Sequence, residues 1–310
     1  MITVAGFNTA IDRLMTVDRF EPGTVQRASS VRSYPGGKGV HVAQTIAALG
    51  EAVQLVGLTD GMHRNLIARR MSERGVLFHG VEIAGDMRCC LALRERSGRM
   101  SEVLDPGPEL HVRERQQLLD ALGRCIEESD AVVMSGSLPR GFDPDTYAQL
   151  VESVDQRRTP CLVDASGETL RLAAKAQPYL LKPNRDEASQ LAGRDVQTLD
   201  EAIAVAVQLH RQGIALPVLT LGALGAVGFD GSDTWHAAID IGEAANAVGS
   251  GDCLLAGMTV ALVRTGDLGQ ALRLGVACGA ANAVHEETGY VQRAQVNALL
   301  PMVKLDKIGG

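Results

Sequence analysis

Short, uninterrupted apolar runs alternate with longer stretches of helical pattern along most of the chain. The apolar runs predict strands at residues 2–7, 52–58, 131–135, 160–164, 179–181 and 217–221. The longer stretches predict helices at residues 39–49, 65–74, 113–128, 145–157, 168–174, 199–212, 250–264 and 270–285. Strands that are apolar at every position are typical of a parallel sheet covered by helices on both faces. The alternation therefore predicts an α/β fold, a doubly wound, mostly parallel sheet flanked by helices.

Two segments, residues 13–34 and 87–105, depart from this rhythm because polar and apolar residues alternate in them. Such alternation is typical of strands with one exposed face, and Ser97-Gly98 supplies a turn within the second segment. We interpret both as inserted strands of a small β-sheet lid over an active site. A plain surface hairpin or an oligomer contact would have the same pattern. The 310 residues suffice for two domains, but we predict one domain over residues 1–310.

Composition narrows the class of protein. The chain is 45% hydrophobic and 22% charged, as is usual for a soluble globular protein. Its net charge of −7 argues against a nucleic-acid-binding face. The longest apolar run, residues 253–263, is well short of the ~20 residues that a membrane span needs. The N-terminus does not resemble a signal peptide, and no two cysteines have Cys-x-x-Cys spacing. We therefore expect a cytoplasmic protein without nucleic-acid or membrane partners.

The stretch Asn246-Ala247-Val248-Gly249-Ser250-Gly251-Asp252 joins a glycine turn to an apolar helix. The first backbone N–H groups of a helix lack partners within it, and with the helix dipole they form an anion site. An aspartate there repels an anion, but it can take the proton from a hydroxyl that attacks a phosphoryl group. The stretch therefore indicates phosphoryl transfer, although an ordinary glycine turn with Asp252 as a helix cap has the same sequence.

A second glycine motif, Gly36-Gly37-Lys38-Gly39, precedes the predicted helix at residues 39–49. Its glycines allow a substrate to approach the backbone closely, and Lys38 supplies a cation. The motif is not a Walker A loop, because that pattern needs glycine where Arg32 stands and serine or threonine where Gly39 stands. A simple helix-entry turn is the alternative.

Polar residues follow two of the predicted strands. Asn8 and Asp12 come after the first, where doubly wound folds bind ligands, and a carboxylate there suits sugar hydroxyls. A surface ion pair with Arg13 is the alternative for Asp12. After the strand at residues 179–181, Asn184 and Glu187 have the spacing of a helix capping box. They could equally hold Mg²⁺ through water near nucleotide phosphates.

Two further signals are weaker. Residues 221–226, Leu-Gly-Ala-Leu-Gly-Ala, link two apolar strands, and their glycines would let an adenine ring lie against the backbone. A tight hairpin needs the same residues. Arg88 begins the second lid segment, and on its inner face it would clamp a substrate phosphate. Most arginines, however, are simply solvated.

In order and spacing, these motifs resemble the ribokinase-like (phosphofructokinase-B) family of sugar kinases over nearly the whole chain. The anchors are Asn8 to Asp12, Gly36-Gly37-Lys38-Gly39, Ser135-Gly136-Ser137-Leu138-Pro139, Lys182-Pro183-Asn184 with Glu187, Leu221-Gly222-Ala223 and Gly249-Ser250-Gly251-Asp252. The first glycine motif is similar to that of the hexose-phosphate branch, which includes tagatose-6-phosphate kinase and 1-phosphofructokinase. The resemblance implies a ribokinase-like fold with a small β-sheet lid.

The resemblance also implies roles for individual residues. Asp252 would be the general base, with the amides of Gly249, Ser250 and Gly251 as the anion hole. The substrate-binding residues would be Asp12, Gly36, Gly37, Lys38, His41 and Arg88. Mg-ATP would be held by Asn184 and Glu187, the metal through water, and the nucleotide would be bordered by Thr220, Gly222, Gly225 and Asn282. The implied ligands are ATP, Mg²⁺ and a sugar phosphate, and the lid offers a surface for a homodimer.

Four residues depart from the pattern of the hexose-phosphate branch. Thr9 stands where proline is usual, Met87 where threonine is usual, and His41 and Cys89 where asparagine is usual. All four lie in motifs that the resemblance assigns to sugar binding, whereas the motifs that it assigns to nucleotide binding keep the family pattern. The identity of the sugar is therefore the part of the function that the resemblance leaves open.

We expect an ATP-dependent kinase that converts a ketohexose phosphate (tagatose 6-phosphate, fructose 6-phosphate or fructose 1-phosphate) to the bisphosphate. A kinase of an unphosphorylated sugar or nucleoside is one alternative, and it would gain support if Lys38 and Arg88 lay away from the pocket. A non-catalytic sugar- or nucleotide-binding regulator on the same fold is another. Asp252 argues against a regulator, because a sensor needs no base.

Overall fold

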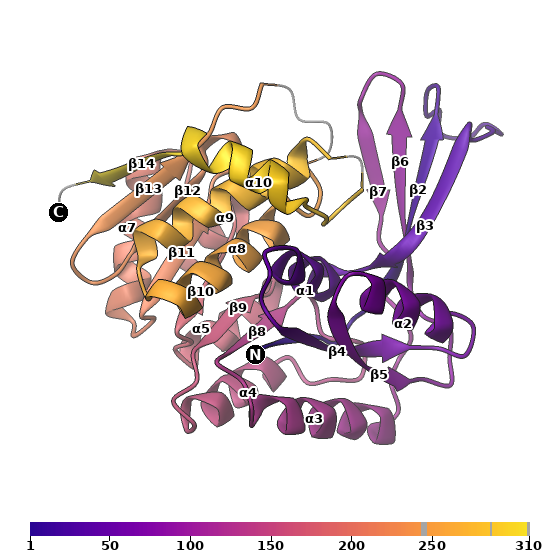
Figure 1. The fold of residues 1–310 in the computed structure, drawn as a ribbon, viewed down its shortest axis with the longest axis horizontal. Helices are drawn as coiled ribbons and strands as arrows, with labels where there is room; N and C mark the ends of the chain where they lie inside the picture. Colours follow the sequence, from indigo (N-terminus) through magenta and orange to yellow (C-terminus); the bar gives the residue numbers. More distant parts are fainter. Residues whose placement is uncertain (243–246, 286, 309–310) are drawn as a thin grey trace.

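The computed structural model describes residues 1–242, 247–285 and 287–308. Within them, the body of the molecule is a ten-stranded sheet in the order β14-β13-β12-β11-β10-β9-β8-β1-β4-β5 (Figure 1). The strands from β5 to β11 in this order are parallel, and β12, β13 and β14 are antiparallel. Their bounds are β1 Ile2–Gly6, β4 Val53–Thr59, β5 Val76–Glu82, β8 Ala131–Ser135, β9 Cys161–Asp164, β10 Leu180–Leu181, β11 Leu216–Thr220, β12 Ala226–Phe229, β13 Thr234–Ala238 and β14 Lys304–Ile308. The prediction of a mostly parallel sheet is confirmed.

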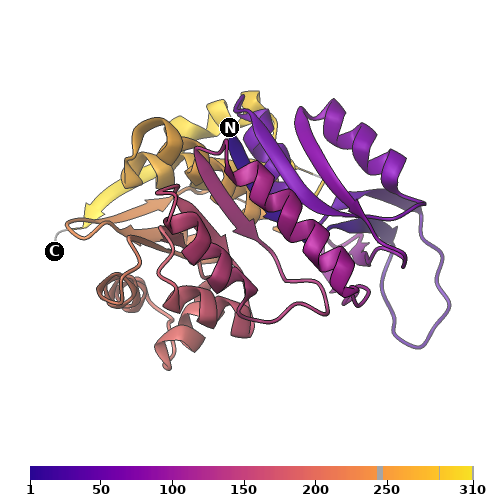
Figure 2. The same ribbon diagram turned by 90° about the horizontal axis from the view of Figure 1, so that it is seen from below.

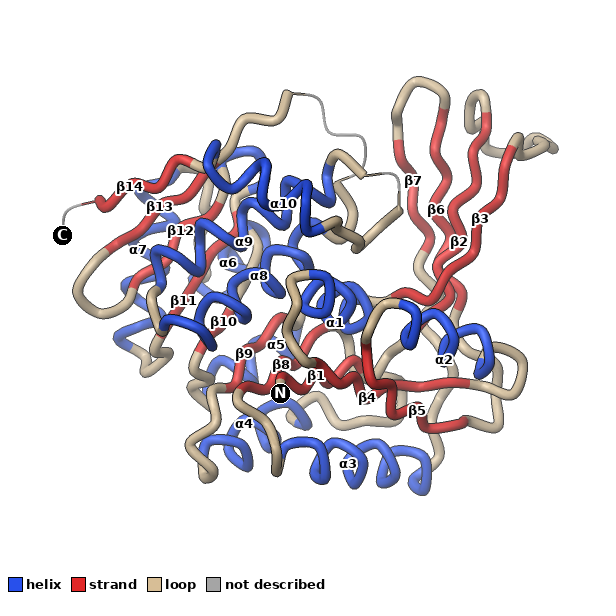
Figure 3. Tube along the Cα trace, in the orientation of Figure 1, coloured by secondary structure: helices blue, strands red, loops and turns tan. Residues whose placement is uncertain are grey.

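Helices cover both faces of this sheet, as Figure 3 shows and as the view from below in Figure 2 confirms. One face carries α1 (Lys38–Ala48), α8 (Ser250–Thr265), α9 (Leu268–Ala283) and α10 (Arg293–Leu299). The other carries α3 (Val112–Ile126), α4 (Thr146–Asp155), α5 (Gly167–Lys175) and α7 (Leu199–Arg211). In addition, α2 (Arg64–Glu73) packs against β5, and α6 (Arg185–Ala192) packs against α7. Every residue of β1, β4, β8 and β9 is buried, which explains their mostly apolar sequences.

A second, four-stranded sheet stands at one end of the body, in the order β3-β2-β6-β7 (Figure 1). Its strands are β2 (Ala10–Val17), β3 (Ser30–Gly36), β6 (Cys89–Glu95) and β7 (Met100–Val103). The central pair, β2 and β6, is parallel, and the two outer pairings are antiparallel. The two alternating segments of the sequence thus pair with each other in one small sheet, which we call the lid sheet.

The chain reverses its direction of winding between β1 and β8. From β1 it proceeds to β4 and β5, then returns to β8 and continues to β11. In doubly wound folds, ligands bind beyond the carboxyl ends of the strands at such a reversal. The loops that follow β1 and β8 meet there, because the Asn8 side-chain amide donates a hydrogen bond of 2.9 Å to Ser137 Oγ.

Every strand and helix in the two lists of predicted elements is present, and no end differs by more than two residues. The elements absent from the prediction are β5, β13, β14 and α10. Strand β5 forms an edge of the large sheet and is buried only at its first residue, Val76, so its sequence has no long apolar run. No helix in the described part of the chain is long and apolar enough to cross a membrane.

Candidate active site

A cavity of about 1490 Å³ lies between the lid sheet and the carboxyl ends of the parallel strands. Ligand pockets for one small molecule typically measure about 300–1,000 Å³, so this cavity has room for two ligands. The lid sheet and the body contribute polar groups from opposite sides. Among those that line it are Asp12, Tyr34 and Glu102 from the lid sheet, and Lys38, Asp164, Lys182, Asn184, Glu187, Thr220 and Asp252 from the body.

The glycine turn at residues 247–251 starts helix α8 at the cavity wall. Gly249 is the N-cap with φ of +81°, and a Cβ atom there would lie 2.7 Å from the backbone nitrogen of Gly289, so only glycine fits. The N–H of Ser250 donates to Ala247 O at 3.2 Å. The N–H groups of Gly249 and Gly251 have no partner among the described residues. The predicted anion hole thus has two available amides, while that of Ser250 is already used in the turn; Asn246 lies outside the described residues.

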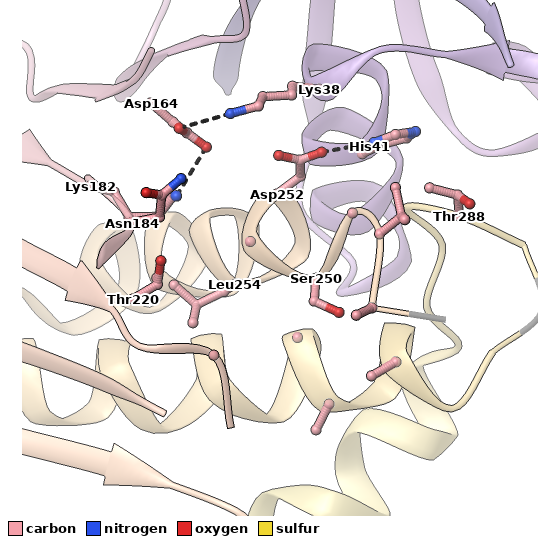
Figure 4. Close-up of a pocket in the computed structure, with 18 of the residues that line it drawn as sticks. Lys38, His41, Asp164, Lys182, Asn184, Thr220, Ser250, Asp252, Leu254 and Thr288 are labelled. Carbon is pink, nitrogen blue, oxygen red and sulfur yellow. Dashed lines mark hydrogen bonds and ion pairs between the residues drawn. The ribbon is translucent and has the colours of Figure 1, made fainter. Parts of the chain in front are cut away.

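Asp252 lies in the first turn of α8, with its side chain pointing toward His41 (Figure 4). Its Oδ2 is 2.8 Å from His41 Nδ1, and the other ring nitrogen, Nε2, is 3.3 Å from Asp12 Oδ2. The second carboxylate oxygen of Asp252, Oδ1, has no hydrogen-bond partner in the described part of the chain. Asp252 is therefore held by one oxygen and can use the other toward a ligand.

Lys38 and Lys182 share the carboxylate of Asp164 (Figure 4). Lys38 Nζ is 3.2 Å from Oδ1 and Lys182 Nζ is 3.1 Å from Oδ2. Burial alone would raise the pKa of Asp164, but the two ammonium groups hold it below its usual value. A Cβ atom on Gly251 would lie 3.7 Å from Lys182 Nζ. One carboxylate balances one of the two cations, so this group of three carries a net charge of +1.

The motif analysis singled out neither Lys182 nor Asp164 as a site residue. Both follow from the topology, because Asp164 ends β9 and Lys182 directly follows the neighbouring parallel strand β10. The available signal was the position of each polar residue at the carboxyl end of a buried strand. The side chains of Asp164 and Lys182 are only 1% and 4% exposed, so their pairing is enclosed by protein.

Asn184 and Glu187 form the capping box at the start of α6. Asn184 Oδ1 accepts from the N–H of Glu187 and Glu187 Oε2 accepts from the N–H of Asn184, both at 2.9 Å. The structural interpretation of this pair is therefore confirmed, yet both residues also line the cavity. Burial raises the pKa of Glu187, and its second carboxylate oxygen lies outside the capping bond. Within the described residues, no group of three or more His, Cys, Asp or Glu side chains could hold a metal ion.

Three of the four residues expected to border a nucleotide line the cavity. Thr220, Gly222 and Gly225 line the cavity, at the turn that joins β11 to β12. Asn282 does not line it, which differs from the sequence-based expectation. Its side chain is fully buried behind the wall, donating to Val248 O at 2.8 Å and Ser250 Oγ at 3.0 Å, and accepting from the N–H of Gly289 at 2.7 Å. Asn282 thus ties together the two loops that form the wall.

On the sugar side, the residues expected to bind substrate come together. The cavity is lined by Asp12, Gly37, Lys38, His41 and Arg88. Arg88 Nε donates to Asn8 O at 3.0 Å, and its Nη2 would be 3.4 Å from a Cβ atom on Gly37. Gly36 lies behind this surface, with its Cα against the carboxyl group of Asp12.

The four departures from the family pattern differ in where they lie. Thr9 is buried directly before β2 and bonds to neighbouring backbone, and Met87 is buried in the core. Cys89 is exposed at the start of β6. None of these three lines the cavity, whereas His41 does. The departure that can affect a ligand directly is therefore His41.

Three comparisons with known proteins agree. A model of the pfkB family of carbohydrate kinases matches residues 3–294. The chain is 30% identical over 308 residues to the 1-phosphofructokinase of Bacillus subtilis (strain 168), across 99% of this chain and 100% of that protein. The crystal structure of phosphofructokinase-2 from Escherichia coli in complex with substrates and products is similar with a TM-score of 0.89, at 26% identity, over 97% of this chain and 98% of that one. The same protein in complex with fructose-6-phosphate has a TM-score of 0.88 at 25% identity, over the same shares.

Proposed function

Because the chain belongs to the pfkB family of carbohydrate kinases, we propose that it transfers the γ-phosphoryl group of ATP to a hydroxyl of a ketohexose phosphate, forming the bisphosphate. The observation that supports this most is the start of α8. There the carboxylate of Asp252 and the unpaired amides of Gly249 and Gly251 border one cavity. A base and an anion site at one helix start are what the transfer of a phosphoryl group to a hydroxyl requires.

The proposed step is an in-line displacement at the γ-phosphorus. Asp252 takes the proton of a primary hydroxyl of the sugar as that oxygen bonds to phosphorus, and the bond from phosphorus to the bridging oxygen of ADP breaks. The amides of Gly249 and Gly251 donate to the transferring group, and the Lys182 ammonium beside Gly251 adds positive charge. Closure of the lid sheet would exclude water and so limit hydrolysis of ATP.

Mg²⁺ fits the body side of the cavity as a cation held mainly by phosphates and water. Such a cation needs few protein carboxylates, and Glu187 has one oxygen outside its capping bond. Asn184, adjacent to it, would hold a metal-bound water. When bound there with the nucleotide, Mg²⁺ would supply positive charge to the phosphates.

A phosphorylated sugar suits the lid side better than an unphosphorylated one. Arg88 and Lys38 both line the cavity, whereas a neutral sugar or a nucleoside would present no anion to them. The relatives named 1-phosphofructokinase and the phosphofructokinase-2 solved with fructose-6-phosphate point to the same class of substrate. We therefore propose tagatose 6-phosphate, fructose 6-phosphate and fructose 1-phosphate as the candidate substrates.

The test is a coupled assay of ADP release with the purified protein, ATP and Mg²⁺. The three ketohexose phosphates are compared with fructose, tagatose and a nucleoside as matched acceptors that lack the phosphate. We expect turnover with at least one ketohexose phosphate and kcat/KM at least a hundredfold lower for each unphosphorylated acceptor. Equal or better turnover of an unphosphorylated acceptor would overturn the substrate class. Binding of both ligands without turnover would favour the non-catalytic regulator.

We also propose that two copies pair through the outer face of the lid sheet. Val31 and Val103 are 52% and 63% exposed, and the β-strand alternation places them opposite the cavity-facing Tyr34 and Glu102. Met15 pairs with Val31 and Leu93 across the sheet, so this face is largely apolar. Light scattering should give the mass of a dimer, and Val31→Glu with Val103→Glu should give a monomer. A wild-type monomer at micromolar concentration would contradict the proposal.

A further inference from the structure

His41 is buried between two carboxylates that belong to opposite walls of the cavity. Nδ1 lies 2.8 Å from Oδ2 of Asp252 on α8, and Nε2 lies 3.3 Å from Oδ2 of Asp12 on β2 of the lid sheet. The imidazole ring is 6% exposed. Figure 4 shows His41 and Asp252 pointing toward each other from helices α1 and α8.

The geometry requires a particular protonation state of this ring. An ionised carboxylate only accepts hydrogen bonds, and a neutral imidazole has only one N–H to donate. Two carboxylate oxygens at the two ring nitrogens are both satisfied only by an imidazolium. Burial opposes this charge, but the hydrogen bonds to Asp12 and Asp252 raise the pKa of His41 to about 10.

The backbone of Gly289 also restricts the imidazole ring of His41. Gly289 has φ of +67°, and a Cβ atom there would lie 2.0 Å from Cγ of His41, so the backbone packs directly on the imidazole. Gln44, one turn further along α1, donates from Nε2 to Gly289 O at 2.6 Å. The ring therefore has little freedom to turn away from the two carboxylates.

We propose that His41 is a positioning residue, a charged link that holds Asp12 and Asp252 at one separation and so couples engagement of the sugar by Asp12 to alignment of the base. The proposal rests on the proposed function, in which Asp12 accepts from sugar hydroxyls and Asp252 takes the proton. A sugar that spans both carboxylates would lie across His41. The hydroxyl bound by Asp12 and the hydroxyl deprotonated by Asp252 would then be set at a defined distance on one molecule.

The charge of His41 would also reduce the repulsion between the two carboxylates and phosphorylated ligands. Two carboxylates in a cavity that must accept two phosphorylated ligands repel those ligands. The imidazolium reduces the charge of the group of three from −2 to −1. After proton transfer to Asp252, the ion pair of Asp12 and His41 that is left carries no net charge. Asparagine, the usual residue in the family branch, carries no charge and has its donors on one atom, so it cannot bridge in this way.

The first test needs no substrate. ¹⁵N-histidine NMR of the full chain at pH 8 should show one imidazole with both nitrogens protonated. That signal should be lost in His41→Asn, shifted in Asp12→Asn and in Asp252→Asn, and unchanged in Gln44→Ala. The last variant is a matched control, because it removes the neighbouring contact to Gly289 and leaves both carboxylates in place. A neutral ring at His41, or a signal indifferent to both aspartate variants, would overturn the proposal.

The second test measures coupling by steady-state kinetics. In the wild-type background, Asp12→Asn should raise KM for the sugar phosphate and also lower kcat, because His41 loses one of its two anchors. In the His41→Asn background, the same change should raise KM, but the loss of kcat should be smaller than in the wild-type background. The two losses should differ by a factor of roughly 2–150, the range for residues in one hydrogen-bond network. KM for ATP should stay the same throughout. Equal effects of Asp12→Asn on kcat in both backgrounds would contradict the coupling.

The two tests separate failure of this proposal from failure of the proposed function. If no ketohexose phosphate is phosphorylated, the proposed function fails, while the NMR signal still decides whether the charged link exists. If turnover is normal but the NMR signal is that of a neutral ring, only the link is wrong. His41→Asn restores the residue usual in the family branch, so its folding is expected, and His41→Gln provides a second variant with a longer side chain.

Discussion

The two walls of the cavity differ in how their polar groups are held. On the body wall, Asp164 lies between two lysines, and Asn184 forms a capping box with Glu187. These groups lie at or next to the ends of strands and helices of the body. On the lid wall, side chains such as Glu102 stand on a four-stranded sheet whose strands are only partly buried. The groups of the body wall are therefore oriented before any ligand arrives. The polar groups of the lid wall have fewer partners within the protein, so their orientation depends more on contacts with a ligand.

In the proposed reaction, this difference would assign phosphoryl transfer to the body wall and sugar recognition to the lid wall. Charge stabilisation of a transferring phosphoryl group profits from groups that need no rearrangement. Recognition of a sugar that must enter and leave profits from a wall that can open and close. His41 lies where the two walls meet, since it contacts Asp252 on one side and Asp12 on the other.

The largest expected effect comes from the body wall. Asp252→Asn should lower kcat by about two to four orders of magnitude, the range for loss of a general base. The fold and the affinity for nucleotide should be kept, because the amide preserves the shape of the side chain. Kinetics and nucleotide titration on the purified variant provide the measurement. Asp186→Asn, also at the cavity, is the matched control, and near-normal kcat in Asp252→Asn would disprove the role of the base.

The next prediction concerns the contribution of the buried charges on the body wall to the stability of the protein. Asp164→Ala removes the carboxylate that Lys38 and Lys182 share, and it should lower the free energy of unfolding by about 3–5 kcal/mol, as when a buried pair loses one partner. Urea denaturation would measure the change. Replacing Lys182 by methionine in the same variant should restore part of the loss, because it removes an uncompensated buried cation. A loss below about 1 kcal/mol would show that these charges are solvated.

A third effect belongs to the lid side. Arg88→Ala should raise KM for the sugar phosphate by roughly 10- to 150-fold, since a hydrogen bond to a charged group contributes about 1.5–3 kcal/mol. KM for ATP should change little. Lys38→Ala should raise the same KM and also lower kcat, because Lys38 shares Asp164 with the lysine beside the anion hole. If Arg88→Ala raised KM for ATP as much as KM for the sugar phosphate, Arg88 would not be specific to sugar binding.

The smallest effect separates the structural and ligand-binding roles of one residue. Asn184→Ala removes a helix cap and should cost about 1 kcal/mol of stability. Thr198→Ala is the matched control, because Thr198 and Glu201 form the same capping box at the start of α7. Both variants should lose similar stability in thermal unfolding, while only Asn184→Ala should raise KM for Mg-ATP. If both leave that KM unchanged, Asn184 acts as a cap alone.

The sequence was sufficient for the buried framework and for the local motifs. Strands such as β8 and β9 are apolar at every position except the last because both faces are covered, and that pattern is visible without a structure. The capping box at Asn184 follows from spacing within one turn of helix. The edge strand β5 was missed because its exposure leaves it without such a pattern.

Contacts between distant segments could not be predicted in the same way. His41 was expected at the substrate, but its contact with Asp252 joins residues 211 positions apart. The resemblance implied that Asn282 borders the nucleotide, whereas in the structure its amide bonds to the two loops that form the cavity wall. The shared use of Asp164 by two lysines likewise arises only when β9 and β10 pair.

The packing of α1 against α8 has a consequence for the order in which the molecule is made. Synthesis begins at the N-terminus, so β1, the lid strands and His41 leave the ribosome long before Asp252 does. Until α8 emerges, the face of α1 that it covers has no neighbour, and Asp12 is the sole carboxylate of the pair within reach of His41. A nascent or shortened chain that ends before Ser250 would carry the residues expected to hold a sugar, yet it would lack Asp252, the proposed base. The proposed base is therefore synthesised after the lid sheet and Lys38, and cavity residues of α9 such as Val276 follow it.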